Sequence, residues 1–226
     1  MVLKKVELTG TWGLKLPFAL LSVYLFFLYP AARIFLPPQV SEYCYDIFLA
    51  AVLFYLLWVR KISPADLGIK FRHYRQNLLI GGLAGAAVLL ALPALDGFVS
   101  LSGLEQTELL AESAVVPHKT ADPLPWVILI LLRAVMEQIF FSGFVVQALL
   151  KKYNPFLVIY AAGALFALLH FTFNLGTFAI GLITAYGYYL TGTLVAPLAF
   201  QVSCRFAGVL LETVYPRLIT LTGFLF

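Results

Sequence analysis

The sequence predicts an all-α fold, a polytopic membrane bundle of about seven transmembrane helices that occupies residues 1–226 as a single transmembrane domain. Hydrophobic residues make up 62% of the 226 residues and charged residues only 12%, a balance that water-soluble domains do not show. The apolar residues form runs of roughly 20, each long enough to cross about 30 Å of hydrocarbon. Most cations lie in short loops beside these runs, which is the pattern that sets membrane topology.

Seven apolar runs are expected to be helices. The first contains Pro17 and Pro30 and is not followed by a small-residue cleavage site, so we expect a permanent span instead of a cleaved signal peptide. The third contains Gly81, Gly82 and Gly85, which allow close helix packing in lipid. The runs cover residues 16–36, 43–59, 78–95, 124–150, 155–173, 175–190 and 193–211.

The cations of the loops are concentrated on one side of the expected membrane. The other side has Arg33, Lys119 and Arg217 and an acidic outer loop, 96–123, which we expect to be a solvated connector, with an interfacial helix over 105–113 as the alternative. The positive-inside rule therefore predicts a cytoplasmic N-terminus and a C-terminus outside, and the net charge of +4 indicates topology and no nucleic-acid partner. The concentrated cations are Lys4, Lys5, Lys15, Arg60, Lys61, Lys70, Arg72, Arg75, Lys151 and Lys152.

Four ionisable residues stand out inside the expected spans: Arg133, Glu137, His170 and Arg205. Ionisable groups are costly in lipid, so they usually face the bundle interior and serve a function. Arg133 and Glu137 are four residues apart and share one helical face. At about 1.5 Å per residue, Glu137, His170 and Arg205 lie about 18–22 Å from the cytoplasmic ends of their spans. We therefore expect three helices to bring these groups into one layer.

Two interpretations of this layer are open. In the first, Glu137 and His170 activate a water held between them, and Gln201 or Arg205 donates hydrogen bonds to the developing oxyanion. In the second, Glu137 pairs with Arg133 or Arg205 only to neutralise charge, and His170 is a hydrogen-bonded core residue.

Three short motifs surround these residues. The first reads E-Q-I-F-F-S-G from Glu137, the second is F-A-L-L-H and ends at His170, and the third runs from Gln201 to Arg205 after a T-G…A-P turn at 191–197. In order, spacing and membrane placement they resemble the CAAX-protease and bacteriocin-processing family of intramembrane glutamic-type proteases, whose members include the CAAX prenyl endopeptidases. The resemblance covers a family-like core of about 60–212.

The resemblance implies that Glu137 and His170 are catalytic and activate water, and that the third motif stabilises the oxyanion. The sequence departs from the family pattern at four positions, where a glutamate, an arginine, a histidine and an asparagine are replaced. The first two exchanges together remove one charge of each sign, so they leave no new buried charge unpaired. The four replacing residues, which we expect to support the site, are Gln138, Ser142, Gln201 and Arg205. Arg133 is a candidate counter-ion for Glu137.

These observations predict a diverged intramembrane endopeptidase that cleaves a peptide bond near the membrane. The alternative is a catalytically inactive family member, a membrane scaffold or chaperone that binds a hydrophobic segment or partner protein. Expected partners are membrane lipids and a membrane-anchored or hydrophobic peptide, with no cofactor or metal: a zinc site needs three or four good ligands, and His73 and His118 fall in loops. A thiol nucleophile at Cys204 with His170 and a transporter are less favoured.

Overall fold

The computed structural model describes residues 12–41, 43–70, 73–102, 123–171, 174–215 and 218–219. Within these residues the chain is entirely helical and turn-connected, without a strand. When directly continuous elements are joined, seven long helical segments result, which confirms the predicted fold class and helix number.

The segments are built from α-helical pieces (α) and wider π-helical pieces (η). In chain order they are α1 (Lys15–Val23), η1 (Tyr24–Leu28), α2 (Tyr29–Phe35), α3 (Pro38–Ser41), α4 (Cys44–Phe54), η2 (Tyr55–Val59), α5 (Tyr74–Leu101), α7 (Pro123–Gln138), η4 (Ile139–Val146), α8 (Gln147–Leu150), α9 (Pro155–Leu169), α10 (Leu175–Thr191) and α11 (Val195–Thr213).

Two boundaries differ from the sequence-based expectation. Helix α5 extends beyond the apolar run 78–95 at both ends, so residues 96–101 are helical and do not belong to the outer loop. Helix α9 ends at Leu169, because the chain turns at His170 and Phe171 adopts a left-handed conformation with φ of 52°. The rest of the outer loop, with the alternative helix over 105–113, lies outside the described residues.

Clear sequence signals set the ends of α9 and α10. Asn154 precedes Pro155 and caps α9 by accepting a hydrogen bond from the backbone N–H of Phe156. Asn174 caps α10 in the same way by accepting from the N–H of Thr177. Side-chain caps of this kind satisfy N–H groups that a helix leaves without partners. Gly192 then ends α10 in a left-handed conformation that glycine adopts without strain.

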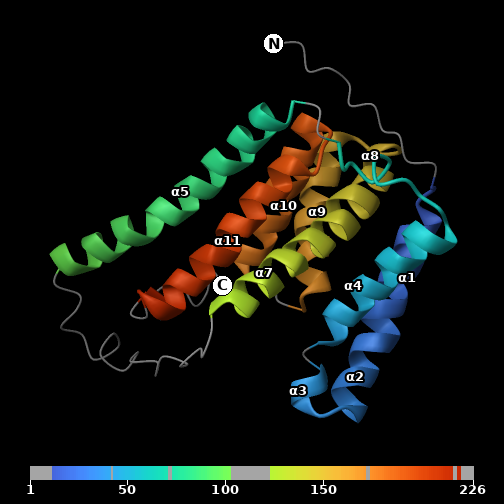
Figure 1. Ribbon diagram of the computed structural model, residues 1–226, viewed down its shortest axis with the longest axis horizontal. Helices are drawn as coiled ribbons and strands as arrows, with labels where there is room; N and C mark the ends of the chain where they lie inside the picture. Colours follow the sequence, from blue (N-terminus) through green and yellow to red (C-terminus); the bar gives the residue numbers. More distant parts are fainter. Residues whose placement is uncertain are drawn as a thin grey trace.

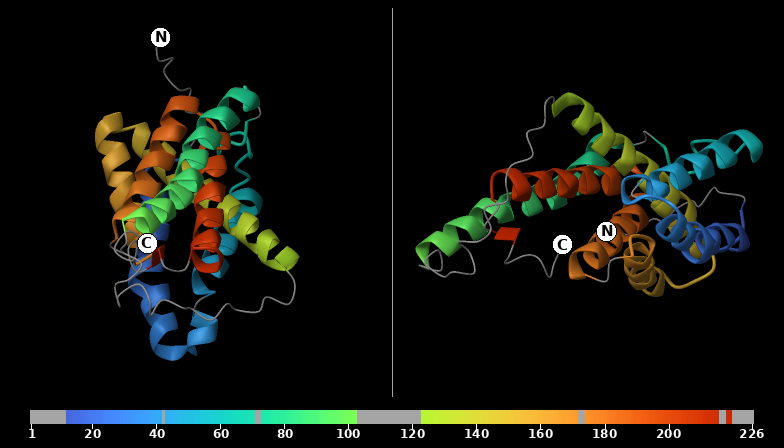
Figure 2. Two further views of the ribbon diagram at one scale, coloured as in Figure 1. Left: turned by 90° about the vertical axis from the view of Figure 1, so that its left-hand side faces the viewer. Right: turned by 90° about the horizontal axis from the view of Figure 1, so that it is seen from below.

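The bundle is arranged around η4. Helices α9, α10 and α11 pack in sequence, and α11 also contacts α5 and α7 (Figures 1 and 2). The pair formed by α1–α2 and α4 lies on the side of the bundle away from α5 (Figure 1). Residues 140–146 of η4 are all buried, in contact with elements from both halves of the chain. The site residues that precede η4 therefore lie at the centre of the molecule.

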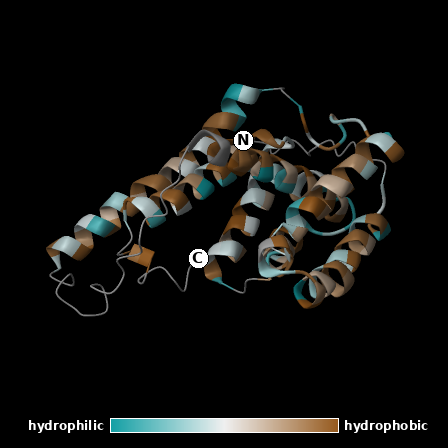
Figure 3. Cartoon of the chain, turned by 60° about the horizontal axis from the view of Figure 1, so that its bottom comes forward, coloured by the Kyte–Doolittle hydropathy of each residue, from teal (hydrophilic) through white to brown (hydrophobic). Residues whose placement is uncertain are grey.

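The helices present apolar residues over most of their length (Figure 3). Four of the described segments are long and apolar enough to cross a membrane: Lys15–Phe35, Tyr74–Leu101, Val127–Leu150 and Val195–Thr213. Two shorter apolar helical segments, Cys44–Val59 and Pro155–Leu169, lie among them. Most of the large exposed side chains on these segments are hydrophobic, as lipid contact requires.

A glycine lets the loop after η2 approach the centre of the bundle. A Cβ added to Gly143 would lie 2.2 Å from the carbonyl oxygen of Leu67. The next residue, Gly68, has a positive φ of 89° and accepts a hydrogen bond from the N–H of Leu194 at 2.9 Å. The sequence Asp66-Leu67-Gly68 thus joins the start of α11 to η4.

The contact between α5 and α11 gives a stability prediction. A Cβ on Gly81 would lie 2.1 Å from the carbonyl oxygen of Ala196, whereas a Cβ on Gly82 would meet nothing within 4 Å. We expect Gly81→Ala to destabilise the protein by about 1–3 kcal/mol through overpacking. Gly82→Ala is the matched control and should be neutral or slightly stabilising, because alanine has the higher helix propensity. Melting temperatures in one detergent test this, and equal values for both variants would contradict it.

Candidate active site

Glu137 occupies the centre of the site. It lies one residue before the end of α7, where the α-helix widens into η4, and its side chain has no exposed surface. Insertions of π-helix often occur at functional sites because they redirect side chains at the point where the helix widens. Here the widened turn follows directly after Glu137 and Gln138.

Four donors surround the Glu137 carboxylate. The hydroxyl of Tyr45 donates to Oε1 at 2.9 Å, and Nη2 of Arg205 donates to Oε2 at 2.8 Å. Nε2 of His170 contacts Oε1, and the amide of Gln201 donates to Oε2. A carboxylate has about four acceptor positions, so protein groups satisfy the whole of Glu137. The structure thus brings together Glu137, His170 and Arg205, which the sequence predicted to share one layer.

His170 is oriented by the end of α9. Its Nδ1 lies 2.8 Å from the carbonyl oxygen of Phe166, one helical turn earlier. Because a carbonyl oxygen only accepts, Nδ1 carries a proton in this arrangement. Nε2 faces a carboxylate oxygen of Glu137, so a further proton lies between these two atoms, on one of them. The two groups are in direct contact, and the water expected between them has no room there.

The replaced motif residues form a neutral hydrogen-bonded chain. The hydroxyl of Ser142 donates to Oε1 of Gln138 at 2.6 Å, and the amide of Gln138 donates to Oε1 of Gln201. The amide of Gln201 in turn donates to Glu137. All four side chains are buried. Each side chain in this series donates to the next one, and hydrogen bonding of this kind is the condition under which buried polar groups are tolerated.

Arg133 does not serve as the counter-ion of Glu137. Its guanidinium lies 3.1 Å from Oδ1 of Asp46 on α4, and it also stacks over the ring of Tyr45 at 5.5 Å. Arg205 is the cation that pairs with Glu137. The spacing of four residues places Arg133 on the same helical face as Glu137, but its partner is Asp46 from the neighbouring helix.

Sequence reasoning missed Tyr45 and Asp46. Asp46 lies inside the apolar run 43–59 and carried the same signal as the four ionisable residues that were singled out. Tyr45 gave no such signal, because a tyrosine in a span is more often a packing or interfacial residue. Both residues come from α4, which lies outside the family-like core of 60–212.

A cavity of about 650 Å³ opens beside the catalytic candidates. His170, Gln201 and Arg205 line it, together with the Arg133–Asp46 pair. Apolar side chains from four helices complete the wall, among them Leu129 and Ile130 of α7, Phe166 of α9, Ile180 of α10 and Val209 of α11. Glu137 itself is not part of the lining. It lies behind His170, Gln201 and Arg205, the three of its four partners that line the cavity.

Other chemistries find little support among the described residues. No three side chains of His, Cys, Asp or Glu converge there on a point where they could hold a metal ion. Cys204 lines the same cavity as His170, but the described contacts include no hydrogen bond between them. His73 lies in the turn before α5, and His118 lies outside the described residues.

The hydroxyl of Tyr45 gives a second stability prediction. We expect Tyr45→Phe to destabilise the protein by about 1.5–3 kcal/mol, because it removes a hydrogen bond to a buried charged group. Tyr55→Phe is the matched control on the adjoining η2, where the described residues offer no hydrogen bond to the hydroxyl. Denaturation in mixed micelles measures both, and an equal stability of the two variants would contradict the role given to Tyr45.

Comparison with known proteins identifies one matching family. The family described as Type II CAAX prenyl endopeptidase Rce1-like matches residues 119–207, which include Glu137, His170, Gln201 and Arg205. No curated protein and no solved structure matches the chain. The apolar helices and the family match together mark an integral membrane protein. Residues 119–207 are therefore similar to the Rce1-like CAAX prenyl endopeptidase family, within the intramembrane protease family that the motifs resemble.

Proposed function

We propose that the protein is a diverged intramembrane endopeptidase in which Glu137 and His170 activate a water for attack on a peptide bond. One observation carries the proposal: the contact between Glu137 and His170 lies directly behind a cavity of about 650 Å³. A carboxylate and an imidazole in direct contact are suited to pass protons to and from a reacting group. The match of residues 119–207, a range that contains both residues, to an endopeptidase family supports the proposal.

The occupied carboxylate must lose a donor before it can act as a base. Gln201 and Arg205 both line the cavity and both donate to Oε2 of Glu137. When a peptide carbonyl enters, these donors turn toward its oxygen, and Oε2 becomes free to accept a water proton. The same movement supplies donors to the oxyanion as it forms, where preorganised donors contribute most to the rate.

The proton balance then closes within the site. Glu137 removes one proton from the water, and the hydroxide oxygen bonds to the carbonyl carbon to give the tetrahedral oxyanion. The C–N bond breaks as the Glu137–His170 pair returns that proton to the leaving nitrogen. The products are one chain with a new amine and one with a new carboxylic acid, which then loses its proton to water.

The apolar part of the cavity wall favours a hydrophobic or membrane-anchored peptide as substrate. Leu129 and Ile130 face this space from α7 and Val209 from α11, and these helices are among the segments that can cross the membrane. The substrate would enter from the lipid and not from water. In this proposal, membrane lipids surround the protein as partners, and the N-terminus lies in the cytoplasm.

Reconstituted protein tests the proposal. The wild type and the variants Glu137→Ala and His170→Ala are placed in proteoliposomes with candidate peptides that carry a lipid anchor or a hydrophobic tail. Cleavage products are identified by mass spectrometry. We expect cleavage by the wild type and none by either variant, and equal cleavage by all three would refute the mechanism.

The full occupancy of Glu137 supports a second function, a catalytically inactive family member that binds a hydrophobic segment. Four protein donors on one carboxylate describe a stable structural ion pair as well as a resting enzyme. In that case, a folded variant such as Glu137→Gln should still retain its partner in pull-down experiments and keep the cellular phenotype. Loss of function in a folded variant would exclude this alternative.

A further inference from the structure

A second cavity, of about 300 Å³, shares His170 and Arg133 with the larger cavity, since both residues line both spaces. Five of its eight lining residues come from the first two helical segments and from α3 between them, outside the region matched by the family. Its lining is Tyr24, Tyr29, Arg33, Ser41, Tyr45, Arg133, Leu169 and His170. We propose that this cavity, called here the tyrosine–arginine subsite, binds a phosphate group.

Most of the subsite lining is polar, and the hydroxyls of Tyr45 and Ser41 already donate to Glu137 and to the carbonyl oxygen of Pro38. The lining contains two guanidinium groups, three phenol hydroxyls and a serine hydroxyl, and no carboxylate is part of it. Arg133 shares its charge with Asp46, which lies on the larger cavity. Arg33 forms no ion pair with a carboxylate of the described residues, so the subsite carries positive charge. Guanidinium groups surrounded by hydroxyl donors match the oxygens of a phosphate.

Hydroxyl protons remain available to a ligand in the subsite. Nε of Arg33 donates to the hydroxyl oxygen of Tyr29 at 3.2 Å, so the Tyr29 proton is left for another acceptor. The hydroxyl of Tyr24 makes no hydrogen bond with a described residue, although its ring is buried. A phosphate would satisfy both.

Aromatic packing holds the subsite in place. The ring of Tyr29 stacks on Phe171 with centroids 3.6 Å apart, and Tyr24 stacks on Phe48 at 4.6 Å. Phe171 directly follows His170 and is the residue with the left-handed backbone conformation. The guanidinium of Arg33 lies 5.3 Å from the centre of the Tyr29 ring. The subsite is thus anchored to the turn that carries His170.

The position of Arg33 in the membrane points to a lipid headgroup as the source of the phosphate. Arg33 is two residues from the end of the apolar segment Lys15–Phe35. The next residues, Ile34 and Phe35, are 73% and 79% exposed, as expected of side chains in contact with lipid. A cation at the end of a span reaches the headgroup layer. A phospholipid beside this helix can place its phosphate in the subsite.

The test measures binding directly and does not depend on cleavage. The purified full chain in a neutral detergent is titrated with dioctanoyl phosphatidylglycerol, and with dioctanoylglycerol as the lipid that lacks the phosphate. Native mass spectrometry counts bound lipid, and thermal unfolding confirms binding through a rise in melting temperature. We expect saturable binding of the phospholipid and none of dioctanoylglycerol.

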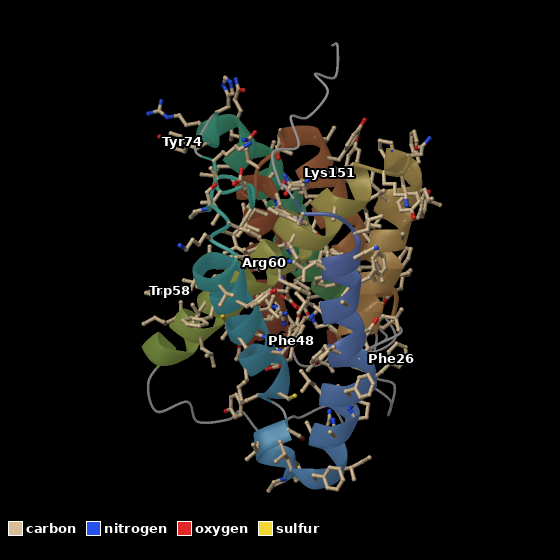
Figure 4. All side chains as sticks on the ribbon, turned by 90° about the vertical axis from the view of Figure 1, so that its right-hand side faces the viewer. Phe26, Phe48, Trp58, Arg60, Tyr74 and Lys151 are labelled. Carbon is tan, nitrogen blue, oxygen red and sulfur yellow. The ribbon has the colours of Figure 1, made fainter. Side chains whose placement is uncertain are left out.

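Two variants and one control assign the binding to the subsite. Arg33→Gln should weaken phospholipid binding about tenfold, through loss of a charged hydrogen bond. Tyr29→Phe keeps the ring and should weaken binding about fivefold. Arg60→Gln is the matched control, because Arg60 (labelled in Figure 4) also lies over a tyrosine close to it in the chain, Tyr55, at 5.9 Å. It should leave the affinity unchanged. Gel filtration and melting curves without lipid verify that each variant is folded.

Inorganic phosphate distinguishes the two sources of the ligand. Competition by inorganic phosphate would show that the phosphate group alone is recognised, and its failure to compete would show that the acyl chains are needed as well. Either result, with Arg33 dependence, supports the subsite. Equal binding of dioctanoylglycerol, or equal weakening by Arg33→Gln and Arg60→Gln, would overturn it.

Discussion

Glu137→Gln is expected to lower kcat/KM for cleavage of a membrane-anchored peptide by about 10²–10⁴-fold, the contribution typical of a general base. The amide has nearly the same shape as the carboxylate but cannot accept a proton from water. It also turns N–H groups toward donors that now bond to a carboxylate oxygen, such as the Tyr45 hydroxyl. Activity is therefore measured per folded protein, after gel filtration and a melting curve.

Glu212→Gln is the matched control for this loss. Glu212 is exposed on α11 and lines the same cavity, but it forms no ion pair or hydrogen bond with the described residues. The control makes the same chemical change and removes the same charge but does not touch the reacting atoms, so it should lose far less activity than Glu137→Gln. Equal activity of the folded Glu137→Gln protein and the wild type would show that cleavage does not use this carboxylate.

The sequence predicts the helices of this fold well because lipid imposes a simple rule. A span must satisfy its backbone within a helix and present apolar side chains, so long apolar runs identify the helices. Apolar runs predict the ends of helices less accurately. The predicted helix was shorter than α5, and the predicted fifth helix included His170, which lies beyond the end of α9. His170 instead follows the last helical residue, and its ring is held by the Phe166 carbonyl.

The candidate site was predictable where burial of charge gave a signal. The cost of an ionisable group in lipid singled out Glu137, His170 and Arg205, and the structure places them in contact. Pairing was not predictable in the same way. Asp46 attracts Arg133 from a separate helix, and such a contact depends on how helices pack, which spacing along one helix does not contain.

The four motif exchanges act together in the structure. Gln138 and Ser142 bond to each other and extend to Gln201, so two positions that would hold opposite charges hold neutral donors and acceptors instead. The counter-charge for Glu137 then comes from Arg205 on α11. The result is one fully satisfied ion pair in place of a larger charged cluster, which lowers the cost of burying the site.

Arg205→Gln is expected to destabilise the protein by about 3 kcal/mol, the lower end of the cost of breaking a buried ion pair. The Glu137 carboxylate has no exposed surface. When the Arg205 guanidinium is lost, only neutral donors and His170 remain to stabilise the negative charge of Glu137. The lower end of the range applies because 32% of the Arg205 side chain is exposed. Chemical denaturation in mixed micelles measures the effect.

Arg133→Gln is the comparison that isolates burial of the carboxylate. It removes the same group from an ion pair whose carboxylate, Asp46, is 20% exposed, so water screens the charge that remains and the loss should be about 1 kcal/mol. A double variant, Glu137→Gln with Arg205→Gln, removes both charges of the buried pair and should recover most of the stability that Arg205→Gln alone loses. If Arg205→Gln and Arg133→Gln cost the same, or if the double variant is less stable than Arg205→Gln, the buried carboxylate does not depend on Arg205. In that case the four donors of Glu137 are not a single electrostatic unit, and the release of Oε2 by movement of Arg205 loses its physical basis.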